Sequence, residues 1–119
     1  MFKLQEPSVN HGEREIRLYQ TADRRIPFAQ WLESLPDDTT KQRIDARLIR
    51  LRLGNFGDCK FVGEGVYELR IDLGPGFRVY FGQVAGKIVI LLCGGDKSTQ
   101  QKDIARAQAY WADSKKRRK

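Results

Sequence analysis

Hydrophobic and polar residues alternate from Cys59 onward with a period of two, which is typical of β-strands. The alternating segments are CKFVG (59–63), VYELRIDL (66–73), FRVYFGQV (77–84) and KIVILLC (87–93), and glycine-rich turns separate them. Short turns between successive strands favour antiparallel pairing. The pattern predicts an antiparallel meander. Its last strand is apolar on both faces, so we expect it to be a central strand covered on each side.

The residues before Cys59 follow a helical period instead. A short strand, EIRLYQ (15–20), comes first. Pro27 then begins a helix over 27–35, in which Phe28, Trp31, Leu32 and Leu35 form one apolar stripe. Thr39 and Gln42 have the spacing of a capping box, which predicts a second helix over 39–53 that ends at Gly54. The two helices are expected to form an antiparallel hairpin on the apolar face of the sheet.

A third helix is expected after the last strand. Ser98 and Gln101 again have capping-box spacing, and Ile104, Ala107 and Trp111 give the helix an apolar stripe. The fold class is therefore α+β, with a small antiparallel sheet of four to five strands. A chain of 119 residues suits one domain, 1–119, with a flexible N-terminal arm (about 1–13) and a basic C-terminal tail (about 114–119).

Charge adds the expectation of a polyanionic partner. The net charge is +7, and five basic residues at 115–119 supply most of it. Such a tail either contacts nucleic acid through phosphates or is a solvated terminus. The sequence has no apolar run near the ~20 residues of a membrane span and no signal-peptide pattern at its N-terminus, so we expect a cytoplasmic protein.

Several familiar chemistries are excluded by the motifs. The stretch GGDKSTQ (94–100) has Lys, Ser and Thr after two glycines, but Asp96 stands where a phosphate-binding loop needs glycine. Cys59 and Cys93 lack metal-ligand spacing, and no metal or cofactor is expected. His11 is the single histidine, so a two-histidine ribonuclease mechanism is not available within one chain.

The predicted hairpin of 66–73 and 77–84 gathers polar residues on one face. When the apolar residues of both strands share a face, Glu68, Arg70, Asp72, Arg78 and Tyr80 must share the other. Arg70 then lies opposite either Arg78 or Tyr80. The set is either a ladder of surface ion pairs or an anion site, because arginine binds phosphate with paired donors.

More basic residues stand outside this hairpin. Arg43, Arg47 and Arg50 form a stripe along the second predicted helix, and this stripe is either a solvated face or a contact with RNA or an acidic partner. Lys60 and Lys97 stand where they could reach the same area as the two arginines of the hairpin.

Two long segments, RIDARLIRLRLGNFGDCKFVGEGVYELRIDLGPGFRVYF (43–81) and LLCGGDKSTQQKDIARAQAYW (91–111), resemble the RelE/HigB-like toxins of bacterial toxin–antitoxin modules. The similar branch is that of the addiction module killer proteins. The resemblance implies a RelE-like fold and a metal-independent, ribosome-dependent mRNA endonuclease. It also implies three partners, namely the ribosome, mRNA and a cognate antitoxin, a helix-turn-helix protein of the HigA type.

The resemblance also implies roles for single residues. Arg78, in GFRVYF, matches the basic residue of the RelE active site, and Arg70 falls at a second basic position. Both would stabilise phosphate charge, with Lys97 and Lys60 positioning the RNA backbone and Tyr80 stacking a base or assisting proton transfer. Arg43, Arg47 and Arg50 would contribute to RNA binding. Glu68 and Asp72 either act as bases or hold the arginines in place.

Two other functions remain open for this superfamily. ParE-like members inhibit DNA gyrase without cutting RNA, so the fold alone does not decide the activity. An inactive member could instead act as an RNA-binding or antitoxin-binding module. The cluster of Arg and Tyr residues favours the nuclease, because a gyrase inhibitor has no chemical need for it.

Overall fold

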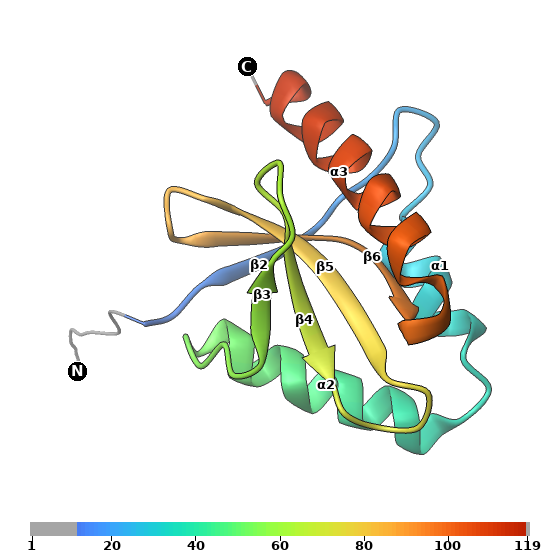
Figure 1. The fold of residues 1–119 in the computed structure, drawn as a ribbon. Coiled ribbons are helices and arrows are strands. Elements are labelled where there is room, and N and C mark those ends of the chain that lie inside the picture. The colour runs from blue at the N-terminus through green and yellow to red at the C-terminus, as the bar shows by residue number, and fades with distance from the viewer. Residues whose placement is uncertain (1–11, 119) are drawn as a thin grey trace.

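A five-stranded mixed sheet forms the centre of the computed structural model, which describes residues 12–118 (Figure 1). Its strands, in the spatial order β2-β6-β5-β4-β3, are β2 (Glu15–Leu18), β3 (Cys59–Phe61), β4 (Tyr67–Ile71), β5 (Phe77–Val84) and β6 (Ile88–Asp96). Successive strands from β3 to β6 pair antiparallel with one another, which confirms the meander. Most of the predicted N-terminal arm, with His11, lies outside the described residues.

The first strand corrects the prediction of a purely antiparallel sheet. β2 pairs parallel with β6, and Glu15 lies opposite Ile88. Two helices and three strands separate β2 from β6 in the chain, so no tight turn fixes their relative direction. The alternation of EIRL indicates a strand but carries no information about its partner.

The placement of β6 agrees with its apolar sequence. It lies between β2 and β5, and residues 89–95 are all buried. Helices cover it on both faces, because α1 and α3 each pack on β6. The expectation of an interior strand covered on each side is confirmed.

Helices α1 (Pro27–Ser34) and α2 (Asp38–Arg52) cover one face of the sheet. Pro27 occupies the first turn of α1, where a missing amide hydrogen costs nothing. The buried core on this side consists of Phe28, Ile44, Leu48, Leu51, Leu69, Ile71, Phe77, Val79, Phe81, Val89 and Leu91. The predicted apolar face is thus confirmed. A helical hairpin in which α1 and α2 pack against each other is not confirmed, since both helices pack on the sheet.

The helix caps differ from those predicted. Asp37 caps α2 by accepting a hydrogen bond of 3.1 Å from the amide of Thr39. Asp96 accepts a hydrogen bond of 2.8 Å from the amide of Ser98, at the start of the short 3-10 helix η2 (Lys97–Thr99). In both places the capping residue is an aspartate two positions before the predicted cap, because its carboxylate is a strong acceptor for free helix amides.

The C-terminal helix α3 (Gln100–Arg117) covers the opposite face of the sheet (Figure 1). Its predicted stripe is confirmed: Ala107 and Trp111 are buried and Ile104 is half-buried. The second core also contains Tyr19, Val66, Tyr80, Ile90, Leu92 and Cys93. Residues 115–117 of the basic C-terminal tail belong to the last turn of this helix. None of the helices within residues 12–118 is long and apolar enough to span a membrane.

Two tryptophans pack against the sheet from opposite sides, each over a glycine. A Cβ atom added to Gly82 of β5 would come within 3.0 Å of the Trp111 ring, and one added to Gly94 of β6 would collide similarly with Trp31. The missing side chains therefore allow α3 and α1 to approach the strands closely.

Candidate functional site

The β4–β5 hairpin places two arginines directly opposite each other. Arg70 pairs with Arg78 across the strands, and Glu68 pairs with Tyr80. The sequence left open whether Arg78 or Tyr80 faces Arg70, and the register shows that it is Arg78. All four residues lie on the face of the sheet that α3 covers in part.

Glu68 lies at the centre of this group with no exposed surface. Its carboxylate accepts hydrogen bonds from the Arg70 Nε (2.9 Å), the Tyr80 hydroxyl (3.0 Å) and the Gln100 Nε2 (2.8 Å). Burial alone raises the pKa of Glu68, but the three hydrogen bonds outweigh burial and hold its pKa below the ordinary value. Glu68 therefore stays ionised and ties the start of α3 to the hairpin.

Arg78 is less exposed than the alternation of its strand suggested, with only 9% of its surface accessible. Its Nε lies 3.8 Å from the Glu68 carboxylate and has no hydrogen-bond partner, although it is buried. The contact of its Nη1 with the carbonyl of Phe77, at 3.4 Å, is long. Arg78 thus has an N–H group for which the protein supplies no hydrogen-bond acceptor.

Tyr80 lies inside the second core and has no exposed surface. Burial, together with the negative charge of Glu68, raises the pKa of its hydroxyl far above the ordinary value. The ring therefore offers no stacking surface for a base, and the hydroxyl keeps its proton, which it donates to the Glu68 carboxylate. The role expected for Tyr80 does not fit this position, which results from the packing of α3 over β5.

Arg70, Arg78 and Lys97 come together around a cavity of about 350 Å³. The other residues that line this cavity are Asp58, Asp72, Gly74, Pro75 and Gly76. Lys97 comes from η2, directly after β6, and is exposed. Three of the four side chains predicted to be catalytic thus share one cavity.

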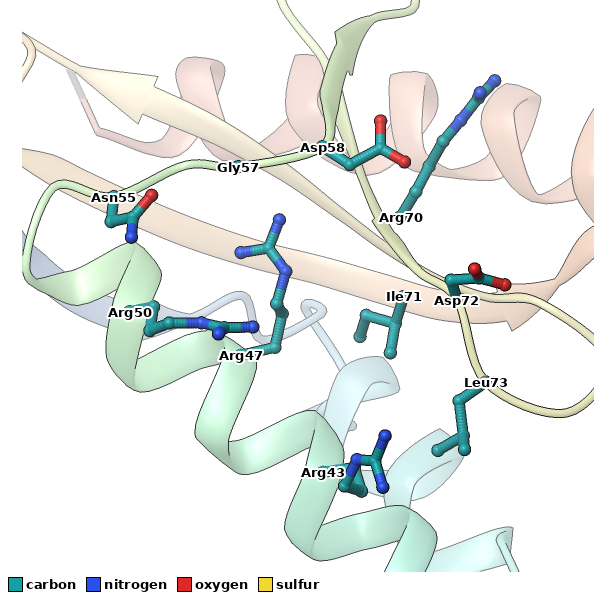
Figure 2. Close-up of a pocket in the computed structure, with 10 residues that line it drawn as sticks. All are labelled: Arg43, Arg47, Arg50, Asn55, Gly57, Asp58, Arg70, Ile71, Asp72 and Leu73. Atoms are coloured by element: carbon teal, nitrogen blue, oxygen red, sulfur yellow. The ribbon is translucent and has the colours of Figure 1, made fainter.

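A second cavity, of about 450 Å³, lies between α2 and β4 (Figure 2). Its lining residues are Arg43, Arg47, Arg50, Asn55, Gly57, Asp58, Arg70, Ile71, Asp72 and Leu73. Asp58, Arg70 and Asp72 line both cavities, so the two adjoin. We call the two cavities together the basic groove. Six cationic and two acidic side chains line it, which makes it suited to a polyanion.

The arginine stripe of α2 is divided between two environments. Arg43 and Arg50 are exposed, whereas Arg47 is buried and its Nη2 donates a hydrogen bond of 2.6 Å to the carbonyl of Phe56. Burial lowers the pKa of Arg47. Arg47 therefore fixes the loop after α2 in place as well as lining the groove.

Lys60 does not line the basic groove. It is exposed on the edge strand β3, opposite Glu68. Conversely, the groove contains Asn55 and Asp58, which the sequence analysis did not single out. They precede β3 in an irregular loop, where periodicity gives no orientation. Within residues 12–118, no group of three or more His, Cys, Asp and Glu side chains could hold a metal ion.

Residues 30–112 match the family described as Phage derived protein Gp49-like (DUF891). The chain belongs to this family. The family is associated with toxin–antitoxin modules. An uncharacterized protein of Haemophilus influenzae is 54% identical over 83 residues, which cover 70% of this chain and 84% of the relative. All residues of the basic groove lie inside the part of the chain that matches the Gp49-like family.

Proposed function

We propose that this protein is the toxin of a bacterial toxin–antitoxin module and that it cleaves mRNA in the basic groove during translation. Membership of the Gp49-like family, with its association with such modules, supports the toxin role. The resemblance of GFRVYF and its surroundings to RelE/HigB-like toxins supports mRNA cleavage on the ribosome. A sheet with helices on its apolar face is compatible with a RelE-like fold.

The observation that carries the proposal is the unused donor capacity of Arg78 beside Arg70 and Lys97. The Arg78 Nε is buried without a hydrogen-bond partner, and an unpaired buried donor costs free energy of folding. Its presence therefore calls for a functional explanation. A phosphate in this cavity would supply the missing acceptor, because arginine binds phosphate oxygens with paired, charge-assisted hydrogen bonds. The geometry therefore favours an RNA phosphate between the two arginines.

The chemistry requires stabilisation of negative charge as the ribose 2′-hydroxyl attacks the adjacent phosphorus. Arg70 and Arg78 are held by Glu68 before the substrate arrives, so little reorganisation is needed when charge develops. The exposed Arg43 and Arg50 would bind flanking phosphates and set the position of the strand. Lys97, from η2, would complete the cation cluster.

Brief induction of the protein in bacteria tests the proposal directly. We expect protein synthesis to stop within minutes and mapping of mRNA 5′ ends to reveal new cuts inside coding regions. Purified protein should cut the same mRNA on ribosomes, and the same mRNA without ribosomes tests the dependence on translation. Altered DNA supercoiling with intact mRNA would contradict the proposal and indicate a gyrase inhibitor.

We also propose that a neighbouring gene encodes an antitoxin that covers the basic groove. A groove with six cations and two carboxylates attracts an acidic or amphipathic segment. Co-expression should give a complex that remains intact in gel filtration at micromolar concentration and cuts no mRNA. Separate elution of the two proteins would contradict this pairing.

A further inference from the structure

The proposed cleavage needs a group that removes the proton of the 2′-hydroxyl, and the obvious candidates are not available. Glu68 is fully buried and its carboxylate already accepts three hydrogen bonds. Tyr80 is fully buried as well. Arginine and lysine side chains carry their protons at neutral pH and offer no acceptor. Of the groove residues, only Asp58 and Asp72 provide side-chain carboxylates.

Asp58 is held firmly, although it lies in an irregular loop. Three hydrogen bonds fix the loop: the amide of Asn55 donates to the carbonyl of Arg50 (2.9 Å), Arg47 donates to that of Phe56 (2.6 Å), and the amide of Arg70 donates to that of Asp58 (2.9 Å). The backbone of Asp58 is thereby attached to the strand that carries Arg70. A catalytic carboxylate requires this kind of fixed position.

The side chain of Asp58, in contrast, is free. It is exposed, and the neighbouring Arg47 and Arg70 donate their side-chain hydrogen bonds to Phe56 and Glu68 instead. It lines both cavities of the groove and turns toward the side chain of Arg70 (Figure 2). The negative charge of Asp58 contributes to raising the pKa of Arg70, after the larger contribution of the hydrogen bond to Glu68. Asp58 and Arg70 thus lie close enough to act on the same nucleotide.

We infer that Asp58 is the general base of the RNA cleavage, an inference that rests on the proposed function. Asp58 takes the proton of the 2′-hydroxyl while the 2′-oxygen forms a bond to the adjacent phosphorus. The bond between phosphorus and the 5′-oxygen breaks, and the leaving 5′-oxygen takes a proton from the Lys97 ammonium. The products are a 2′,3′-cyclic phosphate and a 5′-hydroxyl. Exchange of protons with water restores Asp58 and Lys97.

Single-turnover cleavage of ribosome-bound mRNA by Asp58→Asn tests this role, with Asp45→Asn as the matched control. Asp45 is an exposed residue of α2 that lines neither cavity, so Asp45→Asn removes the same charge outside the groove. Asp72→Asn tests the other carboxylate of the groove as the competing base. We expect Asp58→Asn to cleave about a hundred- to ten-thousand-fold more slowly, the contribution usual for a general base. Asp45→Asn should stay within a few-fold of the wild type, and the loss in Asp72→Asn should be smaller than the loss in Asp58→Asn.

The pH dependence separates a base from a residue that only positions Arg70. The wild-type rate should fall more steeply on acidification than the rate of Asp58→Asn, because Asp58→Asn keeps Glu68 but lacks the proposed base. Binding of ribosome-bound mRNA with a 2′-deoxy nucleotide at the cleavage site should be unchanged or tighter in Asp58→Asn. A rate of Asp58→Asn near that of the wild type, an equal or larger loss in Asp72→Asn, or identical pH profiles of Asp58→Asn and wild type would overturn the role of Asp58.

Failure of this inference is distinguishable from failure of the proposed function. Wild-type protein that cuts mRNA alongside an equally active Asp58→Asn variant would remove only the role of Asp58. Wild-type protein that cuts no mRNA on ribosomes would overturn both. The 5′ ends of the fragments give a further check, because the reaction above leaves a 5′-hydroxyl that a kinase can label without prior phosphatase treatment.

Discussion

Arg70 and Arg78 face each other directly across β4 and β5, although like charges in such positions repel. The Glu68 carboxylate offsets this repulsion, since one of its oxygens lies 2.9 Å from the Arg70 Nε and 3.8 Å from the Arg78 Nε. The two guanidiniums are therefore kept together by a buried anion. They do not depend on RNA for their position.

Replacement of Glu68 should destabilise the protein. Glu68→Gln keeps the shape of the side chain but removes the charge that Arg70 and Arg78 share and one acceptor oxygen. We expect a loss of about 2 kcal/mol in the free energy of unfolding, as is typical of hydrogen bonds to charged groups. Urea denaturation measures the change. Asp72→Asn, an exposed carboxamide on the same hairpin, should change stability by less than about 0.5 kcal/mol.

The contribution of Glu68 to stability should depend on pH in the acidic range. Its pKa is lowered in the folded protein from an ordinary value of 4.5, so its stabilising effect is present above pH 4.5. The effect is lost as the pH falls through the folded-state pKa. The difference in unfolding free energy between wild type and Glu68→Gln should therefore be constant near pH 7 and shrink below pH 4.5. A difference that grows on acidification would contradict the lowered pKa.

Arg78→Ala should abolish mRNA cleavage and growth arrest. The loss of one preorganised donor typically slows a reaction about a hundred- to a thousand-fold. Arg43→Ala, which removes an exposed cation at the far side of the groove, should have a much smaller effect. Because Arg78 is mostly buried beside Glu68, its truncation should also lower stability, so cleavage is measured where circular dichroism shows the variant folded. Cleavage by folded Arg78→Ala at the wild-type rate would rule out its role.

Gly82→Ala should disturb the packing of α3 on the sheet. The new methyl group would overlap the Trp111 ring, and overpacking of this kind costs about 1 to 3 kcal/mol. We expect a lower melting temperature and stronger quenching of tryptophan fluorescence by acrylamide. Gly86→Ala serves as a control, since a Cβ there meets no atom within 4 Å, although its positive φ adds backbone strain. Quenching should stay unchanged in Gly86→Ala, and equal quenching in both variants would contradict the proposed overlap.

Local patterns in the sequence predicted much of the fold. The period of two assigned Leu69, Ile71 and Phe77 to a buried face, and the short GPG turn brought Arg70 and Arg78 onto the other. These predictions succeed because strand alternation and tight hairpins involve only neighbouring residues. The parallel pairing of β2 with β6 was missed because it joins segments at opposite ends of the chain.

For the candidate site, the sequence predicted which cations come together but not which side chains are buried. Arg70, Arg78 and Lys97 do share a cavity, but alternation alone placed Arg78 and Tyr80 outside the core. Both are buried because α3 packs on that face, which no pattern within β5 reveals. Asp58 was overlooked because it lies in a loop without periodicity, and its position depends on contacts from α2 and β4.

The parallel pairing of β2 with β6 also has a consequence for a protein made from its N-terminus. β2 is synthesised before the other strands of the sheet, but its partner emerges only with residues 88–96, after all of them. Until then both cores lack the buried residues of β6, and Lys97 is not yet present. A nascent chain interrupted before Ile88 therefore has neither a closed sheet nor a complete groove. The cation cluster assembles only after Lys97 has been made, and under the proposed function this order would delay action on the ribosome that makes the protein.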